Sequence, residues 1–220
     1  MSFPAPRMGS WLNGLVGLVS SWMLAVLFYR TWQYPLEVEH GAWVRWGFAV
    51  LGMELVSVLA GAFVNGLADP NVEVQLNDVV LQGERHRPLR RRLVVFLSIF
   101  FGLAGVVIAI VAGSWLMLIS FAGVMVSRSK GLLANSAEAN RIQFKHFAGL
   151  LVVFILTLIL TCVMPLSKGG LTPEVLAQVY PNGAGLWFEG LERALVLGVI
   201  YFGAAGIFEL STARWRHQSP

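Results

Sequence analysis

The stretch AWVRWGFAVLGMELVSVLAGAFV, residues 42–64, decides the fold class of this chain. It is apolar over most of its length and long enough for an α-helix to cross a bilayer, which takes roughly 20 residues. Near its middle it carries Glu54, and a carboxylate in such a run is rare and costly. The stretch therefore predicts a membrane-spanning helix and makes Glu54 the first candidate for a functional residue.

The composition of the whole chain points to the same solvent. Of its 220 residues 56% are hydrophobic and only 13% are charged, whereas roughly 25% charged residues are usual in soluble domains. The net charge of +4 fits Lys and Arg placed in loops that fix the orientation of membrane helices. The single cysteine, Cys162, cannot close an intramolecular disulfide. We expect an all-α, polytopic helical membrane bundle.

The apolar runs predict six transmembrane helices in one membrane domain that covers residues 1–220. The run of 35 uncharged residues between Arg92 and Arg128 would be about 52 Å long as one helix, too long for one crossing. A break at Gly113-Ser114 divides it into two spans. The expected spans are about 11–29, 42–64, 93–112, 114–130, 147–164 and 186–209, with cytoplasmic loops at 65–92 and 128–146.

The distribution of basic residues favours six spans over five. With six spans and both termini in the cytoplasm, 12 Lys and Arg residues lie inside and 4 lie outside, whereas five spans divide the same 16 residues equally. Cytoplasmic loops carry an excess of Lys and Arg. We therefore expect a multi-pass protein of a bacterial-type inner (plasma) membrane.

Small and polar residues form one face of the second span. A face of this kind suits close contact with other helices in lipid, and Arg45 is half a turn out of phase with Glu54, so the two cannot pair within the helix. Glu54 is then either a neutral acid that bonds a neighbouring helix, or a proton or cation site. The face consists of Gly47, Glu54, Ser57, Gly61 and Asn65, of which Glu54, Ser57 and Asn65 form the candidate buried polar site.

The first cytoplasmic loop contains two distinct patterns. Alternating apolar and polar residues on both sides of Asn77-Asp78 predict a small β-hairpin at 72–82. A basic cluster follows it, and we interpret the cluster as a topology anchor that meets anionic lipid headgroups. Without aromatic residues between its members, it does not indicate nucleic-acid binding. The cluster consists of Arg85, Arg87, Arg90, Arg91 and Arg92.

The last third of the chain offers an interfacial site. Thr172-Pro173 predicts a short helix that begins after a threonine cap. Glu189 and Arg193 are four residues apart and form a candidate ion pair on the outer side, either as an anchor for the depth of the helix or as part of a vestibule. Glu209 is expected near the inner surface in contact with solvent.

The sequence lacks the motifs of the common catalytic and cofactor sites. It contains no HExxH, P-loop or CxxC pattern, and its histidines, which include His146, are expected in loops or at helix ends. We therefore expect no catalytic set, no metal and no cofactor. An intramembrane enzyme using Glu54 with Glu189 or Glu192 is disfavoured because these groups are predicted at different depths.

Two functions remain. The first is an accessory, assembly or interaction subunit of a membrane system, with a protein partner or as a homo-oligomer. The alternative is a small cation- or proton-coupled transporter or channel that uses Glu54.

Overall fold

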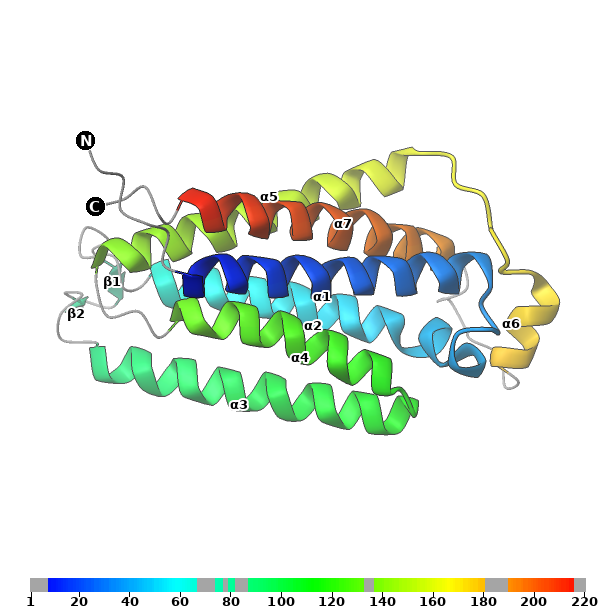
Figure 1. The fold of residues 1–220 in the computed structure, drawn as a ribbon, viewed down its shortest axis with the longest axis horizontal. Helices are drawn as coiled ribbons and strands as arrows, with labels where there is room; N and C mark the ends of the chain where they lie inside the picture. Colours follow the sequence, from blue (N-terminus) through cyan, green and yellow to red (C-terminus); the bar gives the residue numbers. More distant parts are fainter. Residues whose placement is uncertain are drawn as a thin grey trace.

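A computed structural model describes residues 8–66, 74–76, 79–81, 87–132, 137–180 and 190–215. Six long helices run side by side in alternating directions (Figure 1). The start of α1 and the end of α7 lie at the same end of this bundle. The long helices are α1 (Met8–Gln33), α2 (Ala42–Gly66), α3 (Arg87–Ala112), α4 (Trp115–Leu132), α5 (Ala137–Val163) and α7 (Leu191–Trp215), with the short helices η1 (Glu39–Gly41) and α6 (Pro173–Val179).

Five of the helices in the described part of the chain are long and apolar enough to cross a membrane. They are α1, α2, α3, α5 and α7, whereas the apolar part of α4 is the shorter stretch Trp115–Val124. The break expected at Gly113-Ser114 is present, because α3 ends at Ala112 and α4 begins at Trp115. A crossing by α4, and with it the count of six spans, stays a prediction, as does the cytoplasmic location of both termini.

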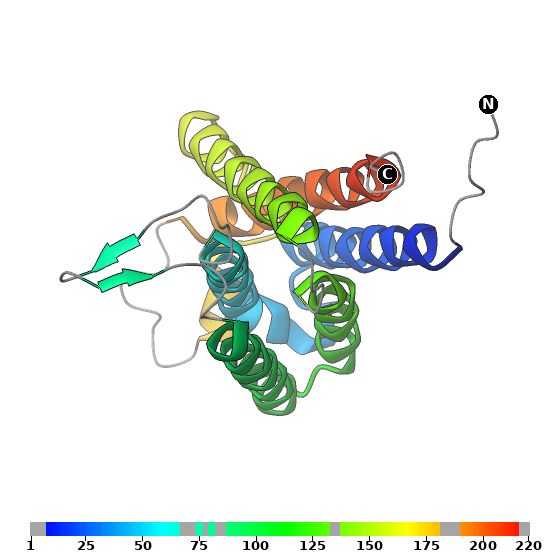
Figure 2. The same ribbon diagram turned by 90° about the vertical axis from the view of Figure 1, so that its left-hand side faces the viewer.

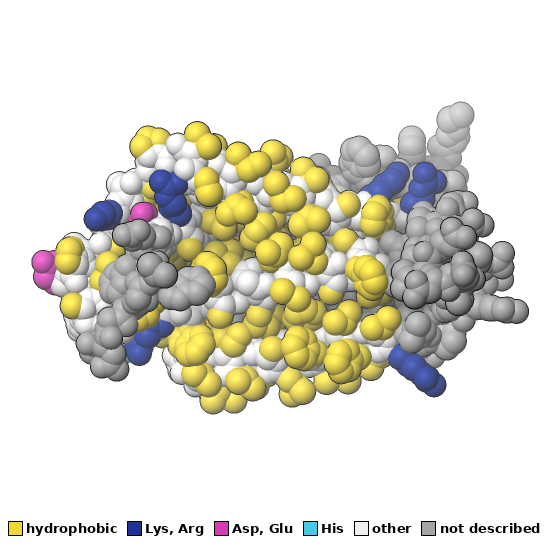
Figure 3. Space-filling view, turned by 180° about the vertical axis from the view of Figure 1, so that it is seen from behind, with side chains coloured by type: hydrophobic (Ala, Val, Ile, Leu, Met, Phe, Trp, Pro, Cys, Tyr) yellow, Lys and Arg dark blue, Asp and Glu magenta, His cyan; other side chains and the backbone are white. Residues whose placement is uncertain are grey.

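The outer surface of the bundle is apolar along its length. Figure 3 shows hydrophobic side chains over the middle of one face and charged side chains toward its two ends. Large side chains such as Phe96, Trp115 and Val163 are exposed. A surface of this kind suits hydrocarbon surroundings rather than water. It supports the membrane class that the composition predicted.

Seen from one end, the six long helices form a closed ring (Figure 2). Successive contacts run from α1 to α7, α5, α2, α3 and α4, and from α4 back to α1. The longest of these contacts joins α1 to α7, the first and last helices of the chain. The interior of the ring is packed mainly by aliphatic and aromatic side chains.

Aromatic rings that pack onto glycines hold neighbouring helices together. The ring of Phe28 lies against both Gly47 and Gly198, and the ring of Phe147 lies against Gly61. In lipid, helices associate largely through such close packing, which small residues allow. The same arrangement joins the pairs Phe121 and Gly105, Phe208 and Gly149, and Trp22 and Gly206.

Two short strands follow α2. Strand β1 (Val74–Leu76) pairs antiparallel with β2 (Val79–Leu81), with Val74 opposite Leu81. The pair falls within the range 72–82 predicted for a hairpin, but the connecting residues 77–78 lie outside the described residues. The position of this segment in the cytoplasm stays a prediction.

Two expected loops are shorter in the structure than in the sequence prediction. Helix α3 begins at Arg87, so the loop expected at 65–92 does not extend to residue 92. Helix α4 continues to Leu132 and α5 begins at Ala137, so most of the segment 128–146 is helical. The sequence predicts a helix start at this point, because Asn135 and Glu138 have the spacing of a capping box, and the observed start of α5 agrees with it. The helices continue past their apolar parts because Arg, Lys and Gln are good helix formers and need no lipid to stay helical.

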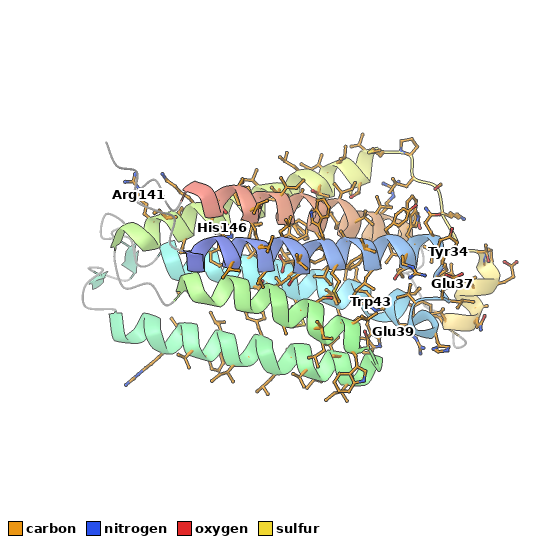
Figure 4. The ribbon with its side chains drawn as sticks, viewed as in Figure 1. Tyr34, Glu37, Glu39, Trp43, Arg141 and His146 are labelled. Atoms are coloured by element: carbon orange, nitrogen blue, oxygen red, sulfur yellow. The ribbon has the colours of Figure 1, made fainter. Side chains whose placement is uncertain are left out.

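Short elements cover the end of the bundle opposite the start of α1 and the end of α7. Thr172 caps α6 as predicted, since its hydroxyl accepts a hydrogen bond from the amide of Val175. The hydroxyl of Tyr180 donates to the carbonyl of Val44, which attaches α6 to the start of α2. Tyr34, Glu37 and Glu39 lie toward this end, far from Arg141 (Figure 4).

Candidate functional site

Glu54 lies inside the bundle, where its carboxylate meets a tyrosine of the last helix. Only 1% of Glu54 is exposed, and Tyr201 of α7 is fully buried. The Tyr201 hydroxyl donates to Glu54 Oε1 over 2.5 Å. Buried polar groups need such partners, because an unsatisfied one costs about 1–3 kcal/mol. The bond joins α2 to α7 in the interior of the ring.

The other predicted members of the polar site have different positions. Ser57 is buried one turn after Glu54, and its hydroxyl donates to the backbone carbonyl of Glu54 over 2.9 Å. The hydroxyl therefore satisfies the helix backbone. The side chain of Asn65 lies outside the described residues. Arg45, at the start of α2, is exposed.

An aromatic layer lies between Glu54 and the end of the bundle that α6 covers. Phe28 stacks on Phe202 with ring centroids 5.6 Å apart and meets Trp43 edge-on at 5.7 Å. All three residues are fully buried. The glycines Gly47 and Gly198 allow this layer, because a Cβ at either position would press on the ring of Phe28. On this side Glu54 is covered by packed rings.

A second buried polar cluster lies nearer the other end, between α5 and α7. His146 Nδ1 is 3.1 Å from the hydroxyl of Thr212, and the imidazole stacks on Phe208 with centroids 5.4 Å apart. His146 is only 6% exposed and Glu209 only 4%. The expectation that Glu209 is solvated is wrong, and so is the placement of His146 in a loop or at a helix end. Neighbouring helices extend past both residues and cover them.

The predicted ion pair on the outer side is only partly described. Glu189 lies outside the described residues, so its pairing with Arg193 stays a prediction. Arg193 Nη1 donates to the carbonyl of Thr161 over 3.0 Å and also to that of Cys162. These carbonyls belong to the last turn of α5, where carbonyl groups lack helical partners and a cation is favoured. Arg193 thereby closes the end of α5 against α7.

The arginine cluster marks the start of α3. Arg87, Arg90, Arg91 and Arg92 belong to the first turns of this helix, whereas Arg85 lies outside the described residues. Arg92 is exposed. A role for these residues as an anchor for anionic headgroups stays a prediction.

Tyr201, the partner of Glu54, is not among the residues predicted for the site. A signal was present, because Tyr201 is a hydroxyl-bearing residue in the middle of an apolar run, ten residues after the start of α7. A buried tyrosine hydroxyl usually finds a hydrogen-bond partner. Which acceptor it finds depends on the packing of α2 against α7, and no local pattern contains that information.

The described residues do not form a metal centre, since nowhere among them do three His, Cys, Asp or Glu side chains come together as ligands. Comparison of the chain with protein-family models, with characterised proteins and with solved structures finds no match.

Proposed function

We propose that this chain is a non-catalytic polytopic membrane protein that serves as an accessory, assembly or interaction subunit of a bacterial-type inner membrane system. The observation that carries the proposal is the buried bond between Glu54 and Tyr201. A carboxylate in a membrane span is the first place to look for a ligand site. Here it is covered by protein and joins two helices, which is what a structural role requires.

The proposed partners follow from a basic surface at the start of α3 and from the apolar surfaces of α3 and α5. The basic residues gathered at the start of α3 suit the anionic headgroups of the cytoplasmic leaflet. The apolar flanks of α3 and α5, with Phe96, Ile99 and Ile159 exposed, are available to a protein partner or a second copy. Nucleic acid is not among the proposed partners.

Two measurements on the intact protein test this function. Co-purification from native membranes in mild detergent should recover a stable partner or a homo-oligomer. Purified protein in liposomes should give no proton or cation flux above that of empty vesicles. Flux that Glu54→Gln abolishes, with folding unchanged, would refute the accessory role.

A small proton- or cation-coupled carrier is the second candidate. A second buried carboxyl, Glu209, favours it, because Glu209 is one turn before Thr212, which contacts the buried His146, and chains of Asp, Glu and His occur in membrane proton relays. In this case flux should be measurable without a partner and should depend on Glu54. The liposome experiment therefore separates the two functions.

The proposed topology can be tested independently. A reporter fused after Lys130 should appear on the cytoplasmic side if α4 crosses the membrane. A reporter at this point on the outer face would exclude six spans with a cytoplasmic N-terminus.

A further inference from the structure

Ser21 and Glu54 lie at the same depth in the bundle. Phe28 of α1 packs against Gly47 of α2, and these two helices run in opposite directions. Ser21 is seven residues before Phe28 and Glu54 is seven residues after Gly47. Seven residues make about two turns, or about 10.5 Å of rise. Ser21 and Glu54 therefore both lie about two turns from the contact between Phe28 and Gly47, toward the end of the bundle where α1 begins. Each lies on the face of its helix that takes part in this contact.

The hydroxyl of Ser21 differs from the other buried hydroxyls. Thr31 and Thr157 are buried and donate to carbonyls of their own helices. Ser21 is fully buried, but its hydroxyl has no hydrogen-bond partner. An unsatisfied buried hydroxyl is costly, and it keeps both a proton to donate and lone pairs that accept. It is chemically suited to pass a proton on.

Glu209 faces the same interior as Ser21. It lies eleven residues, about three turns, after Gly198, which packs on Phe28, so both occupy one side of α7. Trp22 packs on Gly206 and donates to the carbonyl of Gly203. The neighbouring Ser21 therefore lies at a depth between Tyr201 and Glu209. Helical side chains lean toward the N-terminus, which directs Glu209 toward Ser21.

The line of polar groups continues toward the end of the bundle where α1 begins and α7 ends. Thr212 is one turn after Glu209, and its hydroxyl donates to helix carbonyls and contacts His146 Nδ1. Beyond His146, Arg141 and Lys145 are exposed at the start of α5. Figure 4 shows His146 on the side of Arg141, with Trp43 on the other side of the bundle.

The opposite direction is apolar. On the α6 side of Glu54, Phe28 stacks on Phe202 and meets Trp43 edge-on. The single charged residue of α1, Arg30, is in the last turn of this helix, at the end of the bundle that α6 covers. The charged residues of α4, Arg128 and Lys130, are near the end of α4, at the opposite end of the bundle.

Within the described residues, Tyr201 of α7 binds Glu54, and Glu209 of α7 and His146 of α5 lie farther along the bundle. Glu39, which accepts from Trp43 Nε1, and the exposed Arg45 lie on the other side of the aromatic rings.

We infer that Glu54 exchanges protons with one end of the bundle only, through Ser21, Glu209 and the His146–Thr212 pair. A proton accepted by His146 passes to the Glu209 carboxylate. The Glu209 carboxylic acid then gives its proton to the Ser21 oxygen while Ser21 releases its own hydrogen to Glu54, so each hydroxyl is restored. The reverse sequence discharges Glu54. Because the aromatic layer closes the other side, the path loads a proton and does not conduct.

This inference goes beyond the accessory role, since it gives the buried bond between α2 and α7 a ligand, the proton. It predicts that a change of pH at the end of the bundle where α1 begins changes the protonation of Glu54, which accepts the hydrogen bond of the Tyr201 hydroxyl. It excludes proton flux through Glu54, so such flux in the liposome test would contradict it, whereas the co-purification test can fail or succeed independently of it.

Infrared spectroscopy of the full-length protein in nanodiscs tests the path. A pH step should change the carbonyl-stretch band of a buried carboxylic acid, and Glu54→Gln should remove that band. Ser21→Ala and Glu209→Gln should slow the change by about tenfold or more, since positioned transfer groups contribute 10²–10⁴-fold. Tyr201→Phe should shift the frequency of the same band, which identifies Glu54 even if Glu54→Gln folds poorly.

The control is matched in burial. Thr31→Val removes a buried hydroxyl from α1 that already donates to its own helix, and it should leave the rate unchanged. The inference is overturned if Glu54 shows no response to pH, or if Ser21→Ala and Glu209→Gln exchange as fast as the unmodified protein.

Discussion

The hydroxyl of Tyr201 and Oε1 of Glu54 are 2.5 Å apart, although 147 positions separate the two residues in the sequence. The distance is within the range of O–H···O hydrogen bonds. Phe154 and Phe202 pack edge-on against the tyrosine ring, each with centroids 5.1 Å from it. The rings fix the direction of the hydroxyl, so the hydrogen bond has one geometry. Its loss should lower the free energy of unfolding by a measurable amount.

Replacing Tyr201 by Phe should lower the free energy of unfolding by about 1–3 kcal/mol, because buried Glu54 loses a donor. Thermal unfolding in detergent measures this change. Tyr29→Phe, at an exposed tyrosine of α1, removes the same atom and should have little effect. Equal stabilities of the two variants would contradict a structural role for the bond between α2 and α7.

A methyl group at Gly61 should loosen the contact between α2 and α5. A Cβ there would lie 2.4 Å from Cε1 of Phe147, and overpacking of this kind costs about 1–3 kcal/mol. Gly52→Ala is the matched control on the same helix, since a Cβ there meets nothing within 4 Å and alanine favours the helix. Thermal unfolding should rank Gly61→Ala below the unmodified protein, and Gly52→Ala should not fall below it.

Arg193→Leu should loosen the end of α5. The variant loses the donors to the carbonyls of Thr161 and Cys162, and a cation at a helix C-terminus contributes about 0.3–1 kcal/mol. Faster amide hydrogen exchange in residues 160–163 is the expected result. Arg141→Leu, at an exposed position near the start of the same helix, should leave exchange there unchanged. Unchanged exchange in Arg193→Leu would refute the capping role.

Alkaline pH should release α6 from α2. Burial raises the pKa of the Tyr180 phenol, an effect that Arg45 partly opposes. With a folded pKa above the unfolded one, the stabilisation is complete below the unfolded value of about 10. It is lost as the pH rises through the folded value, because a phenolate cannot donate to the carbonyl of Val44.

Hydrogen exchange in α6, followed as the pH rises and corrected for intrinsic rates, measures this loss. Tyr180→Phe lacks the titrating group and should show less protection below the transition and no transition of its own. The same transition in both proteins would assign it to another group.

Features that depend on local chemistry could be predicted from the sequence. The apolar runs predicted the helical membrane class, Gly113-Ser114 predicted the break between α3 and α4, and Thr172 predicted the start of α6. Each is decided by neighbouring residues, through the length of a run, a helix breaker or a cap.

The interior could not be predicted in the same way. Glu209 and His146 lie near the ends of apolar runs, and hydropathy alone places such residues in solvent. They are buried because α1 begins at Met8 and α5 at Ala137, so neighbouring helices extend past them. The partner of Glu54 likewise depends on which helix lies opposite, a property of the assembled ring.

The contact between α1 and α7 has a consequence for biosynthesis. Helix α1 is synthesised well before α7, with which it has its most extensive contact, so it must stay in the bilayer without this contact until α7 has been made. Until then Phe28 and Trp22 of α1 lack Gly198 and Gly206 of α7, on which they pack, and Glu54 lacks Tyr201. A chain stopped before α7 would lack the Tyr201 hydroxyl that binds Glu54, so this buried carboxylate obtains its donor only when the ring of helices is complete.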